Sequence, residues 1–170
     1  RIATQEEQQI LSGYVGWGGL SEAFDEKNGA WYNEYQKLKS LLSPEEYASA
    51  RESTLNAHYT SPIIIRSIYD TLGRMGFEKG NILEPSIGIG NFFGMLPERM
   101  QDSRLYGVEL DSLTGRIAKQ LYPKAEIQIS GFEKTNHPKD FFDVVVGNVP
   151  FGQYKVADKP YDKHNFLIHD

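Results

Sequence analysis

Short apolar runs alternate with amphipathic stretches in the second half of the chain. Four runs have the length and the β-branched, leucine and aromatic content of buried strands, and they occupy residues 81–83, 104–110, 125–129 and 142–146. Residues 112–121, between the second and third runs, have the apolar spacing of a crossover helix. Strands that alternate with helical segments predict an α/β fold with a parallel sheet and right-handed crossovers.

The first sixty residues carry helix signals rather than strand signals. Thr4 and Glu7 form a T-x-x-E capping box, which predicts a helix through Ile10 and Leu11. The glycines of residues 13–19 end this helix and leave two aromatic side chains on flexible backbone. We assign the tryptophan of this stretch to aromatic packing, with DNA contact as the alternative.

Three more helices are predicted before the first strand. One covers residues 31–42, where apolar side chains recur on one face. The next covers residues 43–55, because Ser43 is an N-cap residue followed by proline and two glutamates. The last begins after Ser61, which we expect to cap it, and runs toward Gly76.

These patterns divide the chain into a helical segment, residues 1–57, and an α/β core, residues 58–170, on which the segment packs. Only four strands are counted, so the core is expected to be truncated at its C-terminus. The open edge of the fourth strand is then expected either to pair with another copy of the chain or to be covered by local chain. The first residue is Arg rather than Met, which suggests a piece of a longer protein.

A glycine-containing turn follows the first predicted strand. The strand leads into Glu84, Pro85 and the pair Gly88 and Gly90, after which we expect Asn91 to cap a short helix. A strand that feeds a glycine turn and a helix is a common way for α/β sheets to hold a nucleoside, because glycine lets the backbone approach the ligand closely.

Three interpretations of this turn differ in their ligand. A dinucleotide site requires G-x-G-x-x-G, but here Gly94 comes one residue too late. The carboxylate of Glu84 would also repel a pyrophosphate, whereas it suits a ligand with an ammonium group, such as S-adenosylmethionine. Glu109 lies 19 residues after Gly90, close to the spacing of about 20 at which an acid reaches ribose hydroxyls. The third interpretation is a tight turn without a ligand.

The fourth strand ends in Gly147-Asn148-Val149-Pro150-Phe151. Taken alone, this sequence is also typical of an ordinary turn. Ligands of open α/β sheets bind at the carboxyl ends of the strands, which is where this segment, Glu84 and Glu109 are all predicted to lie.

Together these motifs resemble the adenine-specific amino-group DNA methyltransferases, in particular the methylase region of large helicase–methylase proteins of bacterial conjugative elements. The resemblance covers nearly the whole chain and includes Gly-Trp-Gly-Gly at 16–19 and the segment 56–62. It implies a Rossmann-like S-adenosylmethionine-dependent methyltransferase fold, whose full sheet has seven strands.

The resemblance also implies roles for individual residues. The methionine part of the cofactor would contact the glycine turn, its ribose the acid after the second strand, and its adenine the residues after the third strand, while the segment before the first strand closes over it. The cofactor-binding residues are then Tyr59, Thr60, Glu84, Pro85, Ser86, Gly88, Gly90, Glu109, Leu110, Phe132 and Glu133.

The catalytic motif of that family is Asn/Asp-Pro-Pro-Tyr/Phe, which corresponds here to Asn148, Val149, Pro150 and Phe151. The Asn148 amide oxygen and the main-chain carbonyl of residue 149 would accept the hydrogens of the target amine, and Phe151 would stack on a flipped base. Valine at 149 keeps that carbonyl but loses the rigidity of proline. A second departure is Ser61, since the family has Tyr-Thr-Pro without it.

The implied activity is methyl transfer to the N-6 amine of adenine in DNA. A methyltransferase acting on protein glutamine or RNA, and an inactive methyltransferase-like binding module, remain as alternatives. The implied partners are double-stranded DNA, held mainly by regions outside this chain, and a helicase region of the same parent protein.

Composition narrows these possibilities. The formal net charge of −5 argues against a self-sufficient DNA-binding module. The absence of cysteine excludes a covalent cytosine C-5 mechanism within this chain and suits a cytoplasmic location. The histidines match no metal-ligand spacing, so we expect no metal, and no apolar run is long enough for a membrane span.

Overall fold

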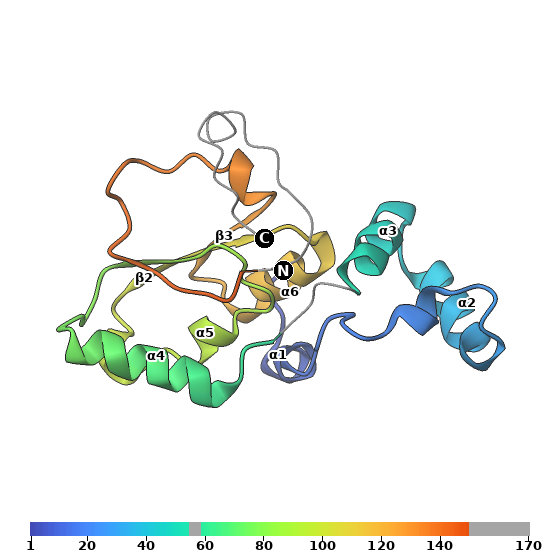
Figure 1. Ribbon diagram of the computed structural model, residues 1–170, viewed down its shortest axis with the longest axis horizontal. Coiled ribbons are helices and arrows are strands. Elements are labelled where there is room, and N and C mark those ends of the chain that lie inside the picture. Colours follow the sequence, from blue (N-terminus) through green and yellow to red (C-terminus); the bar gives the residue numbers. More distant parts are fainter. Residues whose placement is uncertain (55–58, 150–170) are drawn as a thin grey trace, which may run out of the picture.

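The structure, a computed structural model, describes residues 1–54 and 59–149. Its centre is a parallel sheet of four strands in the order β3-β2-β1-β4 (Figure 1). The strands are β1 (Asn81–Glu84), β2 (Arg104–Glu109), β3 (Glu126–Ile129) and β4 (Val144–Val145). The order reverses between β1 and β4, which makes the carboxyl ends of these strands a ligand-binding position. The predicted Rossmann-like α/β fold is confirmed.

Helices cover one face of the sheet. They are α4 (Pro62–Arg74), α5 (Asn91–Gly94) and α6 (Ser112–Leu121), which lie on the same side of the strands in Figure 1. Ile82 of β1 packs with Ile65 of α4, and Ile127 of β3 packs with Ala118 of α6.

The opposite face is covered differently. Leu83, Tyr106 and Val108 are buried there, and the partly buried rings of Phe141 and Phe142 pack against them. Both rings make edge-on contacts with Tyr106 at a centroid distance of 5.3 Å. Two aromatic side chains therefore shield part of this face from solvent, as the helices shield the other face.

The N-terminal segment forms a small helical unit. Its helices are α1 (Gln5–Ser12), α2 (Tyr32–Leu41) and α3 (Pro44–Ser53). Ala23, Phe24 and Ala50 form its buried centre, and Trp17 packs edge-on against Phe24 at 5.4 Å. The packing role predicted for Trp17 is confirmed.

Both predicted capping boxes are present, at Thr4 and at Ser43. The predictions for the other two caps are wrong in detail. Ser61 occupies the N-cap position of α4, but its side chain makes no capping hydrogen bond. Asn91 is the first residue of α5 rather than its cap, because Gly90 takes the cap position with a left-handed φ of 86°.

The fourth strand is shorter than the predicted 142–146. Asp143 lies next to Asn81, but its carboxylate accepts the Asn81 amide hydrogen at 2.8 Å. The Asp143 amide still donates to the Asn81 carbonyl at 3.0 Å, but its side chain takes the Asn81 amide that a longer ladder would pair with backbone, so the paired residues of β4 start at Val144. The other predicted boundaries agree within two residues. The predicted boundary between residues 57 and 58 falls in 55–58, outside the described residues, so the two-part division stays a prediction.

The helical segment is attached to α6 at both ends of that helix. At the C-terminal end of α6, the Gln8 side chain donates to the Gln120 carbonyl at 2.7 Å, and the Ala3 amide donates to the Gln120 side chain at 2.6 Å. At its beginning, the Ser49 hydroxyl donates to Asp111 at 2.7 Å. These contacts hold the segment beside β2 and the start of α6.

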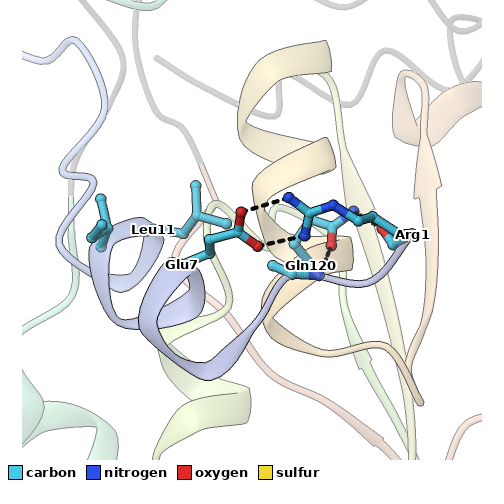
Figure 2. A pocket seen from close by; sticks show the side chains of 6 residues that line it. Arg1, Glu7, Leu11 and Gln120 are labelled. Carbon is cyan, nitrogen blue, oxygen red and sulfur yellow. Dashed lines mark hydrogen bonds and ion pairs between the residues drawn. The ribbon is translucent and has the colours of Figure 1, made fainter.

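A hollow of about 440 Å³ lies at the end of α6 and is lined by Ile10, Leu11 and Gln120 among others. Figure 2 shows Leu11 and Gln120 beside it. Arg1 makes two hydrogen bonds to the Glu7 carboxylate at its edge. Gln120 lies eight residues along α6 from Ser112, which corresponds to about 12 Å. The hollow is therefore separate from the carboxyl ends of the strands.

The edge of β4 predicts self-association. Val145 is 62% exposed on a strand that pairs only with β1 among the described residues. Exposed strand edges pair with other chains unless charges oppose it. We expect the protein to associate as its concentration rises in sedimentation velocity, and Val145→Lys to remain monomeric. Ile63→Lys, at a position of α4 that is 74% exposed, serves as the control and should associate like the wild type. A wild-type protein that stays monomeric throughout would contradict the prediction.

Candidate functional site

The carboxyl ends of β1, β2 and β4 bring together the segments that the sequence analysis selected. β1 ends at Glu84 and β2 at Glu109, and the two strands pair in parallel. The Val146 amide donates to the Leu83 carbonyl at 2.9 Å, which holds the segment after β4 beside the end of β1.

Glu84 is a buried carboxyl group without a partner among the described residues. Its side chain is 3% exposed, and Oε2 accepts no hydrogen bond from the described residues. Burial raises the pKa of this carboxyl well above its ordinary value, and the nearby negative charge of Glu109 raises it further. Burying an unpaired acid is costly, so the arrangement suits a cation that approaches Oε2.

The turn after Glu84 is fixed to the end of β2. The Gly88 amide donates to Glu109 Oε2 at 2.8 Å, and the Ile87 amide donates to the Val108 carbonyl at 2.9 Å. Gly88 and Gly90 both have left-handed φ angles, 56° and 86°. At Gly90 a Cβ would also clash with the Tyr122 ring, so this position requires glycine for its space as well as its conformation.

Glu109 connects the two strand ends. Its Oε2 accepts from Gly88, and its Oε1 accepts from the Asp111 amide at 2.8 Å. Burial raises the pKa of Glu109, an effect that these backbone donors partly oppose. Each carboxylate oxygen has a second lone pair, so Glu109 retains the capacity to accept hydrogen bonds from a ligand. The next residue, Leu110, is 75% exposed.

Asp111 is a second buried acid beside Glu109, and its hydrogen bonds are satisfied. Its Oδ2 accepts from the Thr114 amide at 2.9 Å and from the Thr114 hydroxyl, which caps α6. Its Oδ1 accepts from Ser49 of α3. Asp111 therefore joins the helical segment to the site, a role that the sequence analysis missed although D-x-x-T is a recognisable N-cap pattern.

The loop after β4 lies against the end of β1. A Cβ on Gly147 would be 3.5 Å from Cγ of Glu84 and from Cδ of Pro85. Asn148 follows directly and is exposed, and Val149 is 50% exposed. The structure thus places Gly147, the residue before the predicted catalytic motif, beside Glu84. Asn148 and Val149 follow it in the chain, Pro150 and Phe151 lie outside the described residues, and the catalytic roles stay predictions.

The other predicted cofactor-binding residues differ in their exposure to solvent. Tyr59 lies near the acids, since burial and then the charges of Tyr14, Glu109 and Asp111 raise its pKa. Phe132 follows β3 and is 50% exposed. The remaining members are partly buried (Thr60 and Ser86) or exposed (Glu133). Their roles stay predictions.

Tyr14 is a neighbour of the site that the sequence analysis did not select. Its hydroxyl is buried and lies close to the Thr114 side chain. Burial is the main cause that raises its pKa to about 12, and the charges of Asp111 and Glu109 contribute. The glycine-rich stretch was visible in the sequence, but no local signal connects it with β2.

Two further properties concern the described ranges, 1–54 and 59–149. In them, no group of three or more His, Asp or Glu side chains is arranged to hold a metal ion. No helix there combines the length and the apolar character needed to cross a bilayer.

No protein-family model matches this chain. It is similar to Defense against restriction protein B of Escherichia phage P1, with 32% identity over 163 residues. It is also similar to the type II methyltransferase M.CvrRI of Paramecium bursaria Chlorella virus XZ-6E, with 34% identity over 104 residues. These alignments cover 93% and 61% of this chain, but only 6% and 26% of the two relatives. The chain therefore spans a small part of each.

Solved structures resemble the chain more distantly. A TehB-like S-adenosylmethionine-dependent methyltransferase from Corynebacterium glutamicum aligns with a TM-score of 0.39 at 17% identity, covering 70% of this chain and 53% of that one. A protein from Listeria monocytogenes, described as a candidate class I S-adenosylmethionine-dependent methyltransferase, aligns with a TM-score of 0.48 at 19% identity, covering 84% and 50%.

Glu84 gives the protein a pH-dependent stability. The folded protein holds a proton on this carboxyl more tightly than the unfolded chain, whose ordinary pKa is 4.5. The resulting stabilisation is fully present below about pH 4.5 and is lost as the pH rises through the raised folded pKa. The free energy of unfolding should therefore fall across this window, and Glu84→Gln should reduce the fall and stabilise the protein at pH 7.

Urea denaturation at a series of pH values measures both effects. Glu98→Gln, an exposed position, is the control and should keep the wild-type pH profile. Because the pKa of Glu109 is also raised, a weaker decline with pH should persist in Glu84→Gln. Identical pH profiles for Glu84→Gln and wild type would contradict the raised pKa that we assign to the Glu84 carboxyl.

Proposed function

We propose that this chain is the S-adenosylmethionine-binding part of an enzyme that methylates the N-6 amine of adenine in DNA. The observation that carries the proposal is the unpartnered Glu84 Oε2, buried at the end of the central strand beside a glycine turn. A buried acid at this position calls for a ligand with a positive charge close to a nucleoside.

The donor and acceptor groups fit this cofactor. Glu84 would accept hydrogen bonds from its ammonium group, and Glu109 would accept them from the ribose hydroxyls. S-adenosylmethionine supplies an electrophilic methyl group on a positively charged sulfur. The buried carboxyl group of Glu84 beside the turn disfavours a dinucleotide, because its ionised form would repel a pyrophosphate.

The loop after β4 would hold the methyl acceptor. Asn148 and the carbonyl of Val149 would accept the two hydrogens of an exocyclic amine and so direct its lone pair toward the methyl group. The contact of Gly147 with Glu84 and Pro85 supports a position for this loop next to the cofactor. Phe151 would stack on the flipped base. This stacking would offset part of the free energy, roughly a few kcal/mol, that moving the base out of the duplex costs.

The names of the relatives support a role in methylation and in defence against restriction. One is named a type II methyltransferase and the other is named for defence against restriction. Because the chain carries a net negative charge, we expect regions outside it, including a helicase region of the parent protein, to make most of the contacts with DNA. We also expect a cytoplasmic location.

Two other functions remain to be distinguished by experiment. A methyltransferase for protein glutamine or RNA would use the same acceptors for an amide or a ring amine. An inactive binding module would keep the fold without methyl transfer.

Cofactor binding is tested at Glu109. Glu109→Ala should weaken S-adenosylmethionine binding by about 1–3 kcal/mol, the usual loss when hydrogen bonds to a charged group are removed. Isothermal titration calorimetry measures the change, with the exposed Glu98→Ala as the matched control. Thermal unfolding of each variant checks that the turn held by Glu109 remains folded. An unchanged dissociation constant in Glu109→Ala would remove the ribose assignment.

Methyl transfer is tested at Asn148 in the full-length protein. Asn148→Ala should lower the single-turnover rate on an adenine-containing duplex by ~10²–10³, since it removes one preorganised acceptor, with cofactor affinity much less changed. Val149→Pro should be tolerated, because the carbonyl remains. Asn33→Ala, on the exposed face of α2, is the control.

The same assay separates the alternatives. RNA and protein substrates are tested beside the duplex, so a preference for either would replace the DNA assignment. Methyl transfer at the wild-type rate by Asn148→Ala would identify the motif as a turn rather than an active site.

A further inference from the structure

A hydrogen bond from the helical segment reaches the N-cap residue of α6. The Ser49 hydroxyl of α3 donates to Asp111 Oδ1 at 2.7 Å, across 62 residues of sequence. Asp111 is 7% exposed, so the acceptor lies largely out of solvent. Among the described residues, Ser49 is the only donor to Oδ1, because both groups of Thr114 bond to Oδ2. The orientation of this carboxylate therefore depends on α3 as well as on α6.

The backbone of the same residue orients Glu109. The Asp111 amide donates to Glu109 Oε1 at 2.8 Å, while the Gly88 amide donates to Oε2 at 2.8 Å. One backbone donor thus comes from the start of α6 and the other from the glycine turn. A shift of Asp111 would change the first bond and turn the carboxylate relative to the glycine turn. Two hydrogen bonds in series therefore join α3 to the acid at the end of β2.

Other helical serines of this chain make local hydrogen bonds. The hydroxyls of Ser12, Ser40, Ser53 and Ser67 each donate to a carbonyl three or four residues earlier in the chain. Such a carbonyl is the usual partner of serine within a helix. Ser49 lies within α3 but donates to a carboxylate of another element. Its hydroxyl therefore connects two parts of the protein rather than two turns of one helix.

A second polar contact joins α3 to α6 without involving Asp111. Arg116 donates to the Glu46 carboxylate, and its side chain is 59% exposed. Ion pairs this accessible to solvent contribute little to stability. Glu46 and Ser49 are three residues apart, so they share one face of α3. This face therefore carries one bond to the residue that orients the ribose acid and one exposed pair that is independent of it.

We propose that Ser49 is a positioning residue for the ribose of the cofactor, acting through Asp111 on the carboxylate of Glu109. Docking of the helical segment then controls cofactor affinity, although Ser49 itself need not touch the ligand. This inference rests on the proposed function and deepens it, because it gives a segment outside the α/β core a share in cofactor binding. By linkage, a bound cofactor strengthens the docking of α3 by the factor by which docking strengthens binding.

Calorimetry with S-adenosylhomocysteine tests the inference without requiring methyl transfer. Ser49→Ala should weaken binding about two- to tenfold, the loss expected for one hydrogen bond. With the analogue that lacks both ribose hydroxyls, Ser49→Ala and wild type should bind equally, because Glu109 then has no hydroxyl to hold. Arg116→Gln is the matched control: it removes the exposed ion pair, keeps the bonds of Asp111, and should bind both ligands like the wild type.

The possible failures are distinguishable. Equal affinity of wild type and Ser49→Ala for S-adenosylhomocysteine would overturn the inference and leave the proposed function intact. An equal loss of affinity for the analogue, or an equal loss in Arg116→Gln, would also overturn it, because either result indicates a general loosening of the helical segment. If the wild type binds neither ligand, the proposed function fails and the inference fails with it.

Hydrogen exchange provides a second measurement, on α3 itself. Saturating S-adenosylhomocysteine should slow exchange of the α3 amides about two- to tenfold in the wild type, because binding and docking are coupled reciprocally. This slowing should be smaller in Ser49→Ala. Wild-type α3 amides that exchange equally fast with and without the ligand would overturn the inference, even if Ser49→Ala proves too unstable to titrate.

Discussion

The carboxylate of Glu109 holds the site together, because it accepts one backbone amide from the glycine turn after β1 and another from the start of α6. Parallel strands bring their carboxyl ends to one edge of a sheet, and that edge collects negative charge here. Glu84 is then buried close to a second acid, and the pKa values of both rise. The protein accepts this electrostatic cost at one place, where a cationic ligand would relieve it.

The same edge connects the two parts of the chain. Asp111 follows Glu109 by two residues and accepts a hydrogen bond from Ser49 of the helical segment. The contacts that attach this segment to α6 therefore begin at the residue whose amide orients the Glu109 carboxylate. Docking of the segment and the geometry of the acid are physically linked, so a disturbance in α3 reaches the site through a single buried side chain.

Local signals predicted the elements well. The capping boxes at Thr4 and Ser43 and the extents of β2 and α6 depend on residues a few positions apart, and the structure agrees with them. The errors arose where distant residues compete: the Asp143 carboxylate takes a ladder donor from Asn81, which shortens β4. Tyr14 lies near Glu109 only through the docking of the helical segment, which no periodicity in the sequence encodes.

The pairing of β4 has a consequence for the order in which the sheet opens. β1 and β2 pair through four residue pairs across about twenty residues of chain, whereas β4 adds only two pairs, with Ile82 and Val144 62 residues apart. A strand that closes a long loop and pairs through few residues gains little from its hydrogen bonds relative to the entropy it loses. We therefore expect the amides of β4 to exchange with solvent before those of β1 and β2. The glycine turn thus follows the more extensively paired strand, and the Asn148 loop follows the less extensively paired one. A ligand could be held at the first while the second rearranges around an incoming substrate.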